Sequence, residues 1–389
     1  MIDFSDLLKT DNRQPAHMIQ LLDPDSYDAW NSGQSASTRH MLSAQKFRGK
    51  IGDHALLWGG DQHDWSVVTV VPDRGKMGPW CLAKLAEALP EGQYRLVDGR
   101  AGDAALGWLM AQYRFDRYRQ DDNSTGPKVL LTQDVARIEP TLHLARATAL
   151  VRDMVNVPAA DMGPPDLEQA VERVAQPFGA RVTTTRGDAL EQGFPMIHAV
   201  GKAADRSFAP RLIELEWGEP AHPRLALVGK GICFDSGGLD IKPSSGMRLM
   251  KKDMGGAAHA LALAQLIMAN RLPVRLHLLI AAAENAIGAN AFRPGDILRS
   301  RKGLTVEIGN TDAEGRLVLG DALTRAGEDR PDLVIDFATL TGAARVAVGP
   351  DLPALFCNND DLAGQAIAHG TDVDDPLWRL PLWDPYADM

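Results

Sequence analysis

The chain has 389 residues, of which 45% are hydrophobic and 24% are charged, and its formal net charge is -10. This length and composition predict a globular protein large enough for two domains and exclude a disordered chain. The acidity disfavours a broad phosphate-binding surface, so we do not expect nucleic acid to be a partner.

The beginning of the chain shows no targeting signal. The first residues, MIDFSDLLKTDNRQ, lack the basic and apolar regions of a signal peptide. No later stretch reaches the ~18 apolar residues of a membrane span. Three cysteines, Cys81, Cys233 and Cys357, are scattered and odd in number, and thus form neither a disulfide framework nor a CxxC pair. We expect a cytoplasmic protein without a membrane partner.

Residues 1–130 read as a small N-terminal α/β domain. Apolar and β-branched runs predict strands at 55–58, 66–71, 94–97 and 128–131, with helices at 79–88 and 103–118. The polar stretch QDDNSTG, residues 120–126, predicts a loop. A long apolar periodicity over 134–155 then predicts a helix, and we take residues 131–155 as a connecting helix between two domains.

Residues 156–389 predict a larger C-terminal α/β domain. The pattern alternates again, and it favours a central, mostly parallel sheet flanked by helices. Strands are expected at 181–185, 211–216, 224–228, 275–282, 304–308 and 333–337, and helices at 165–175, 254–269 and 314–327.

Charged residues concentrate in two windows of this second domain. The first is VGKGICFDSGGLDIKPSSGMRLMKKDMGG, residues 228–256, and the second is GNTDAEGRLVLGDAL, residues 309–323. Ligands of open α/β sheets bind at the carboxyl ends of strands, so acids that follow the predicted strands 224–228 and 304–308 can meet in one cleft. The four candidate acids are Asp235, Asp253, Asp312 and Glu314.

Four carboxylates in one partly buried cleft repel each other unless cations neutralise them. Bridging carboxylates can hold two divalent ions ~3.5–4 Å apart, with a hydroxide between them at a pKa near 7. Two basic side chains are available beside them. Lys242 can stabilise an oxyanion, and Arg316 can hold an anion or a substrate group. The set contains the groups that hydrolysis requires.

Each residue also has an ordinary structural interpretation. A single acid is more often a helix cap or a surface charge, and Asp253 directly precedes the predicted helix at 254–269. Lys230 is usually a solvated side chain, and it would have to lose its proton to bind a metal. Gly237 and Gly238 can serve tight turns alone. The co-occurrence of all these residues in two short windows favours the functional interpretation.

Other motifs do not fit. The strand and glycines before Phe234 resemble a dinucleotide fingerprint, but Phe234 stands at its third glycine position. DSGG at 235–238 resembles the nucleophile segment of trypsin-like serine proteases, but those are all-β proteins. The sequence has no HExxH, the metal-binding motif of the zincins. We expect His259 to pack or to face solvent. A two-metal phosphoesterase stays open on the carboxylate chemistry alone.

The second window, NTDAEGRLVLGDAL, resembles the signature of the leucyl aminopeptidase family, the cytosol aminopeptidases. The first window resembles the other active-site segment of that family. Further similarity lies in RDMVNVPAADMGP at 152–164, DFATLTGAARVAVG at 336–349 and PLWRLPLWDPY at 376–386, so it covers most of the chain after about residue 140. The resemblance implies a metallo-exopeptidase that removes single residues from the N-terminus of peptides, with residues 156–389 as its catalytic domain.

The resemblance also implies the metal ligands. Asp235 and Glu314 correspond to the residues that bridge two divalent metal ions. Lys230 and Asp253 complete the tighter site, and Asp312 completes the more exchangeable one. Members of the family use zinc, manganese or magnesium, and this donor set does not select strongly among transition metals.

Two catalytic roles and a substrate pocket follow from the same resemblance. Lys242 polarises the scissile carbonyl and stabilises the tetrahedral intermediate, while Arg316 holds a bicarbonate ion that acts as general base. A structural alternative is that Arg316 only pairs with a neighbouring carboxylate such as Glu307. The residues implied at the substrate pocket are Met250, Asn310, Thr339, Leu340 and Gly342.

Family members form homohexamers, as dimers of trimers, and we expect the same at full length. Relatives continue for several tens of residues past the position of Met389, so we expect a truncated catalytic domain. Some members of the family are regulatory, and a catalytically silent or DNA-binding protein is the alternative. The retained site residues argue against lost catalysis, and the net acidity argues against DNA.

Overall fold

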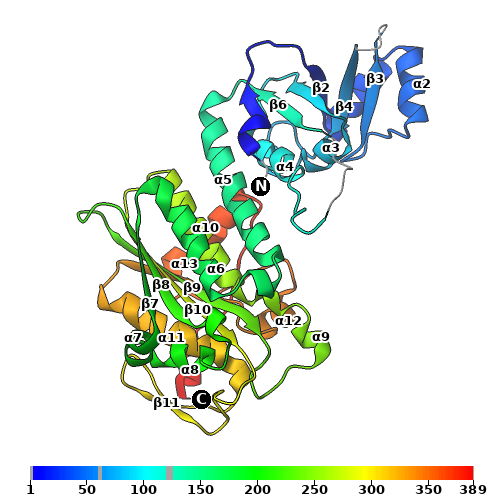
Figure 1. The fold of residues 1–389 in the computed structure, drawn as a ribbon. Coiled ribbons are helices and arrows are strands. Elements are labelled where there is room, and N and C mark those ends of the chain that lie inside the picture. The colour runs from blue at the N-terminus through cyan, green and yellow to red at the C-terminus, as the bar shows by residue number, and fades with distance from the viewer. Residues whose placement is uncertain (1–2, 60–63, 120–125, 389) are drawn as a thin grey trace. The chain divides into compact units, whose positions relative to one another are not determined.

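The computed structural model describes residues 3–59, 64–119 and 126–388. The chain divides into two units, one made of Met1–Ala145 with Thr341–Met389 and one made of Arg146–Leu340. Both are α/β, which confirms the predicted two-domain class (Figure 1). The loop predicted at 120–126 lies outside the described residues except for its last position. No helix in the three described stretches is long and apolar enough to cross a membrane.

The first unit is built on a six-stranded sheet in the order β1-β6-β5-β2-β4-β3. All its pairings are parallel except the antiparallel pair β3–β4. The strands are β1 (Leu8–Thr10), β2 (His17–Leu22), β3 (His54–Trp58), β4 (Trp65–Val70), β5 (Gly92–Leu96) and β6 (Lys128–Thr132). The prediction missed β1 and β2 and located the other four.

The helices of the first unit are shorter than predicted. Helix 79–88 begins only at Ala83. Helix 103–118 covers only Ala105–Met110, and from Tyr113 onwards the side chains are partly or fully exposed, so no apolar face remains to continue the helix. Residues from 341 onwards add two helices and the parallel pair β14–β15. The elements are α1 (Pro24–Ser32), α2 (Ala36–Ala44), α3 (Ala83–Ala88), α4 (Ala105–Met110), α12 (Ala343–Val348), β14 (Ala354–Leu355), α13 (Asp360–Asp372) and β15 (Trp378–Arg379). Helix α5 (Val135–Asn156) has residues in both units.

The second unit contains a five-stranded sheet in the order β13-β9-β10-β8-β7. Strands β13, β9 and β10 are parallel, whereas β8 is antiparallel to both β10 and β7. The sheet is therefore mixed, but β8 is the one reversed strand among its five, in agreement with the predicted mostly parallel sheet. Its strands are β7 (Arg181–Arg186), β8 (Arg211–Trp217), β9 (Arg224–Asp235), β10 (Arg275–Asn285) and β13 (Leu333–Phe337).

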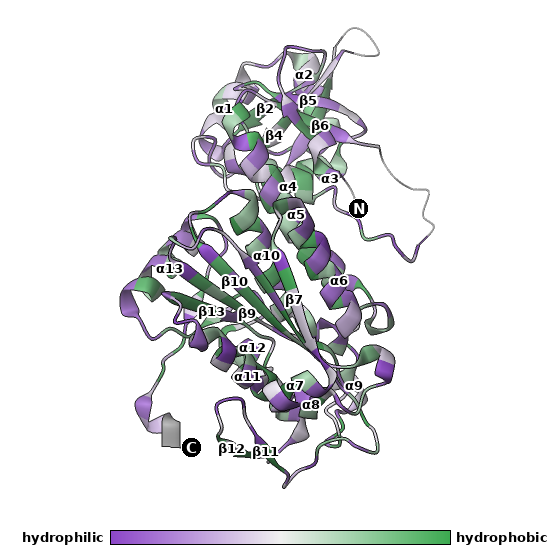
Figure 2. Cartoon of the chain, turned by 60° about the vertical axis from the view of Figure 1, so that its left-hand side comes forward, coloured by the Kyte–Doolittle hydropathy of each residue, from purple (hydrophilic) through white to green (hydrophobic). Residues whose placement is uncertain are grey.

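Helices cover both faces of this sheet. One face packs against α6 (Pro164–Ala175) and α10 (Gly255–Ala269), and the other against α7 (Gly187–Gly193), α8 (Pro195–Gly201) and α11 (Glu314–Glu328). Figure 2 shows β9 and β10 as mostly hydrophobic, as expected for strands buried on both faces. The core between the sheet, α8 and α11 includes Val228, Leu279, Ile197 and Val318.

Two features of this unit position the site. Strand β9 continues to Asp235, seven residues past its predicted end, and Asp235 is in register with Asn285 at the end of β10. The second window, residues 309–323, does not follow a strand of this sheet, because the preceding strand β12 (Thr305–Glu307) pairs with β11 (Ile297–Arg299) in a separate two-stranded sheet. It reaches the site through the 3-10 turn Thr311–Ala313 and the start of α11. A short helix, α9 (Ser244–Met247), lies within the first window.

Candidate metal centre

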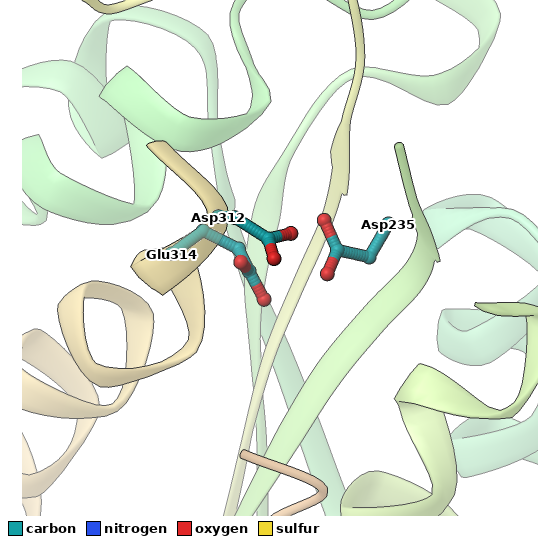
Figure 3. A group of neighbouring side chains, drawn as sticks. All are labelled: Asp235, Asp312 and Glu314. Atoms are coloured by element: carbon teal, nitrogen blue, oxygen red, sulfur yellow. The ribbon is translucent and has the colours of Figure 1, made fainter. Parts of the chain in front are cut away.

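Three carboxylates meet beside the carboxyl end of β9. Asp235 is the last residue of that strand, Asp312 lies in the turn Thr311–Ala313, and Glu314 is the first residue of α11. One oxygen from each lies within 4.8 Å of the others. Figure 3 shows Asp312 and Glu314 facing Asp235 from the opposite side. Asp235 and Glu314 are 3% and 1% exposed.

A buried ammonium group extends this cluster. Lys230, in the middle of β9, is 1% exposed, and its Nζ lies 2.8 Å from Asp253 Oδ2 and 3.0 Å from Glu314 Oε1. It also donates to the carbonyl oxygen of Thr339 at 3.2 Å. Asp253, in the 3-10 helix Met250–Met254, accepts a second hydrogen bond of 2.8 Å from Thr339 Oγ1. Lys230 and Asp253 therefore belong to the same centre as the three carboxylates.

The two predicted catalytic cations have different surroundings. Lys242 Nζ lies 2.9 Å from Asp235 Oδ2 and also forms an ion pair with Asp312. Arg316 is exposed in the first turn of α11. Within the described residues it forms no ion pair with Glu307 or any other acid. Its guanidinium is thus available to a ligand.

The protonation of the centre reflects its burial. Burial raises the pKa of Glu314 to about 7; the Lys230 ammonium opposes this shift, and the Asp235 carboxylate adds to it. Burial alone would lower the pKa of Lys230, but Asp253 and Glu314 raise it above its ordinary value. Burial also opposes the charge of Lys242, yet Asp312 and Asp235 raise its pKa. Without metal ions, the ammonium groups of Lys230, Lys242 and Lys252 pair with the carboxylates.

This donor set fits divalent cations. Glu314 Oε2 is buried and has no hydrogen-bond partner among the described residues. A buried carboxylate oxygen without a partner is unfavourable, and a cation beside it would remove that cost. Carboxylate oxygens with one lysine nitrogen are ligands that zinc, manganese and magnesium accept to differing degrees. Lys230 would have to release its proton to act as a ligand.

The predicted substrate residues are only partly connected to the centre. Thr339 contacts it through Asp253. Met250 begins the 3-10 helix that carries Asp253, and the Asn310 side chain accepts from the backbone N–H of Asp312 at 2.7 Å. Leu340 is half exposed, and Gly342 belongs to the other unit.

His259 lies on α10 and is exposed. Its Nδ1 is 2.8 Å from the carbonyl oxygen of Gly255, and its ring stacks on Phe337. The histidine is therefore outside the group of side chains that could hold a metal ion, as expected.

Two residues outside the predicted set contact the centre. Asn285 donates from Nδ2 to Asp235 Oδ1 at 2.9 Å, and Thr311 directly precedes Asp312. Both are completely buried. Little in the sequence indicated either role. Asn285 is the polar residue that ends the apolar run LHLLIAAAEN, and Thr311 is the second residue of NTDAEGR.

Two glycines allow the segments to approach each other. Gly237 and Gly238 have φ values of 89° and 66°, in the left-handed region that favours glycine. A Cβ on Gly237 would lie 3.1 Å from Asp312 Oδ1, and one on Gly238 would lie 2.9 Å from Asn285 Oδ1. The pair therefore serves both the turn after β9 and the close packing of the centre.

Comparisons with protein families and curated sequences agree with this geometry. The model of the cytosol aminopeptidase family, catalytic domain, matches residues 149–389, and that of the M17 aminopeptidase N-terminal domain matches 18–130. The probable cytosol aminopeptidase of Syntrophotalea carbinolica is 43% identical over 295 residues, which cover 72% of this chain and 59% of the relative. That of Roseiflexus castenholzii is 40% identical over 297 residues, 73% of this chain and 60% of the relative. The chain spans about three fifths of the length of these relatives.

Solved structures show the same similarity. The cytosol aminopeptidase of Coxiella burnetii is 45% identical, with a TM-score of 0.91 over 98% of this chain and 83% of that one. The bottromycin maturation enzyme BotP in complex with Mn is 31% identical, with a TM-score of 0.84 over 96% and 83%. The leucyl aminopeptidase of Trypanosoma brucei in complex with bestatin is 27% identical, with a TM-score of 0.80 over 98% and 82%. Together, the family model and these relatives show that the chain belongs to the cytosol aminopeptidase family.

Proposed function

We propose that this protein is a metal-dependent aminopeptidase that hydrolyses the N-terminal peptide bond of peptides. The observation that carries the proposal is the meeting of Asp235, Asp312 and Glu314 within 4.8 Å, with Glu314 Oε2 buried and unpaired among the described residues. Family membership supports it, and so does the Mn ion bound by the similar BotP.

Five side chains would hold two divalent ions. Asp235 and Glu314 would bridge them, Lys230 and Asp253 would complete one site, and Asp312 the other. When bound, such ions supply a hydroxide at neutral pH and polarise a carbonyl oxygen. Zinc or manganese is the proposed occupant, with magnesium as the alternative.

The protein's own side chains would then act on the peptide. Lys242 is held beside Asp235 and Asp312 and its pKa is raised, so it stays protonated and can donate to the oxyanion that develops on the scissile carbonyl. Arg316 has a guanidinium that no acid of the described chain occupies, and it would hold a bicarbonate as general base. The free α-amine of the peptide would bind at the centre, which restricts cleavage to the first residue. Met250, Asn310, Thr339, Leu340 and Gly342 are proposed to contact that residue.

We further propose a homohexamer, a dimer of trimers, in the cytoplasm. All three cysteines are free, as a reducing compartment favours. Large exposed apolar side chains are typical of surfaces that meet a partner. Those of residues 341–388 include Val346, Phe356, Trp378, Leu382, Trp383 and Tyr386. Sedimentation of the full-length protein at micromolar concentration should give six times the mass of its chain. A monomer of that full-length protein would contradict the assembly, whereas a monomer of the 389-residue chain would not.

An assay of paired substrates tests the activity. Protein freed of metal with a chelator should not cleave an aminoacyl amide, and added Mn²⁺ or Zn²⁺ should restore cleavage. The N-acetylated amide should not be cleaved, because its amine is blocked. Cleavage of a phosphoester without the amide would favour a two-metal phosphoesterase. Bound metal without cleavage of either substrate would favour a catalytically silent protein.

A further inference from the structure

The side chain of Asn285 joins the two windows at their closest point. It is completely buried at the end of β10, next to Asp235 in the sheet register. Its Nδ2 donates to Asp235 Oδ1 at 2.9 Å and to the carbonyl oxygen of Thr311 at 3.1 Å. One amide group thus contacts the carboxylate of the first window and the backbone that carries Asp312.

The hydroxyl of Thr311 makes a second connection. Thr311 is also completely buried, and its Oγ1 donates to the carbonyl oxygen of Gly237 at 2.7 Å and accepts from the backbone N–H of Asp240 at 2.9 Å. Its own backbone N–H donates to Asp240 Oδ2 at 2.7 Å. The loop that follows Asp235 is therefore fastened to the residue that precedes Asp312.

We propose that Asn285 and Thr311 are positioning residues of the metal centre, which fix the spacing between Asp235 and the pair Asp312–Glu314. The inference rests on the proposed function, since it assigns these contacts to the binding of metal. Asp235 belongs to the sheet, whereas Asp312 and Glu314 belong to a turn and a helix that follow a separate hairpin. Ions shared by these carboxylates need one fixed distance between the two segments.

The contacts suit positioning better than general stabilisation. The amide of Asn285 gives a hydrogen bond to Asp235 Oδ1, while the other oxygen of that carboxylate faces Lys242 at 2.9 Å. Together with a 2.9 Å hydrogen bond from the backbone N–H of Gly237 to the same oxygen, this bond holds the rotation of the carboxylate and leaves the other oxygen turned toward the cluster. Gly238, with φ in the left-handed region, leaves the space that these side chains occupy, because a Cβ on it would lie 2.9 Å from Asn285 Oδ1 and 3.0 Å from Thr311 Oγ1.

The test compares variants at one position by Mn²⁺ titration calorimetry on the chelator-treated protein. Thr311→Val keeps the shape of the side chain and removes every hydrogen bond of the hydroxyl, whereas Thr311→Ser keeps the hydroxyl and removes a methyl group. We expect Thr311→Val to bind Mn²⁺ ~10–100-fold more weakly, the usual effect of losing an outer hydrogen-bond partner of a metal ligand. Thr311→Ser should bind within about threefold of wild type. Asn285→Leu removes both hydrogen bonds of the side-chain amide and should weaken Mn²⁺ binding as Thr311→Val does. It provides a second measurement if Thr311→Val does not fold.

A packing control separates positioning from stability. Ile280→Val, at a fully buried position of the same strand, should lower the melting temperature of the metal-free protein without changing Mn²⁺ affinity. Wild-type affinity in Thr311→Val, or an equal loss in Thr311→Ser, would overturn the positioning role and leave the proposed function intact. A wild-type protein that binds no Mn²⁺ would instead overturn the proposed function, and this inference with it.

Discussion

Lys242 and Arg316 are the residues at which binding and chemistry can be separated. Neither is a proposed metal ligand, and Lys242 competes with metal ions for Asp235 and Asp312. We therefore expect Lys242→Ala and Arg316→Ala to retain two metal ions while kcat falls ~100-fold or more, the scale for loss of an oxyanion donor or a positioned base. Elemental analysis and steady-state kinetics measure the two effects. Removal of bicarbonate should slow the wild type and Lys242→Ala but not Arg316→Ala.

A wild-type kcat in Arg316→Ala would show that this arginine has no catalytic role. A metal content below two in either variant would instead make the altered residue part of the metal sites. Arg316 is exposed and forms no ion pair within the described residues, so its removal should have little effect on stability. A lower kcat in Arg316→Ala can therefore be attributed to catalysis.

The raised pKa of Glu314 predicts a pH dependence of the metal-free protein. Its pKa is about 7 in the folded protein against an ordinary value of 4.5, so the folded state retains a proton that the unfolded state releases between these values. The free energy of unfolding should thus fall as pH rises from about 4.5 to 7, by up to ~3 kcal/mol. Urea unfolding in the presence of EDTA measures it. Glu314→Gln has no proton to lose and should not show this component; an unchanged slope in the variant would assign the effect to other groups.

The sequence was informative for charged site residues and uninformative for neutral ones. Asp235, Asp312 and Glu314 could be picked out because several acids in two short windows after predicted strands already suggest a cluster. Lys230 was assigned only through the family resemblance. The roles of Asn285 and Thr311 depend on which backbone atoms lie opposite them after folding. An amide or a hydroxyl in the sequence carries no such information.

Among the elements, those with a long buried face were the most predictable. Helices α6, α10 and α11 and strands β8 and β10 lie close to their predicted ranges, because each is a continuous stretch with many buried apolar residues. Strand β7 was located as well, although none of its side chains is fully buried. Strand direction was not predictable, since β8 and β7 have the same composition whether they pair parallel or antiparallel. The end of β9 was missed because Lys230 and two glycines interrupt an apolar run that only the folded sheet shows to be continuous.

Asp321 connects helix α11, which begins at Glu314, to the neighbouring segments. Its buried carboxylate accepts from the backbone N–H of Met196 at 2.8 Å, in the first turn of α8, and from that of Arg301 at 2.7 Å. Asp321→Asn replaces one acceptor oxygen with a donor, so we expect a loss of ~1–3 kcal/mol of stability. The kcat of the folded variant should stay unchanged. Thermal denaturation and faster hydrogen exchange at the Met196 amide measure the loss.

Glu172→Gln is the matched control, because Glu172 is exposed on α6 and its change removes the same charge. It should alter stability by less than ~0.5 kcal/mol. Equal stability of the two variants would mean that the carboxylate of Asp321 is not an anchor.

For the whole molecule, the arrangement of the ligands decides which part of the chain responds to metal. All five proposed ligands lie in Arg146–Leu340, and none lies on the sheet of the first unit. An ion that binds only the folded state at 100 times its dissociation constant stabilises it by ~2.7 kcal/mol. Because this stabilisation acts where the ligands are, Mn²⁺ should slow hydrogen exchange in β9, β10 and α11 and leave β1–β6 unchanged.

Hydrogen exchange with mass spectrometry, with and without EDTA, measures this difference along the chain. Asp235→Asn supplies the control, since loss of one bridging carboxylate should abolish most of the Mn²⁺ effect in β9 and β10 while the metal-free exchange pattern stays the same. Equal slowing in β1–β6 would show that the two units unfold as one cooperative block, because the binding energy would then be shared by both. No slowing anywhere would mean that the carboxylate cluster does not bind Mn²⁺ in the folded chain. Protection confined to the second unit is the expected result, because the proposed metal ligands and the core of this unit lie within residues 146–340.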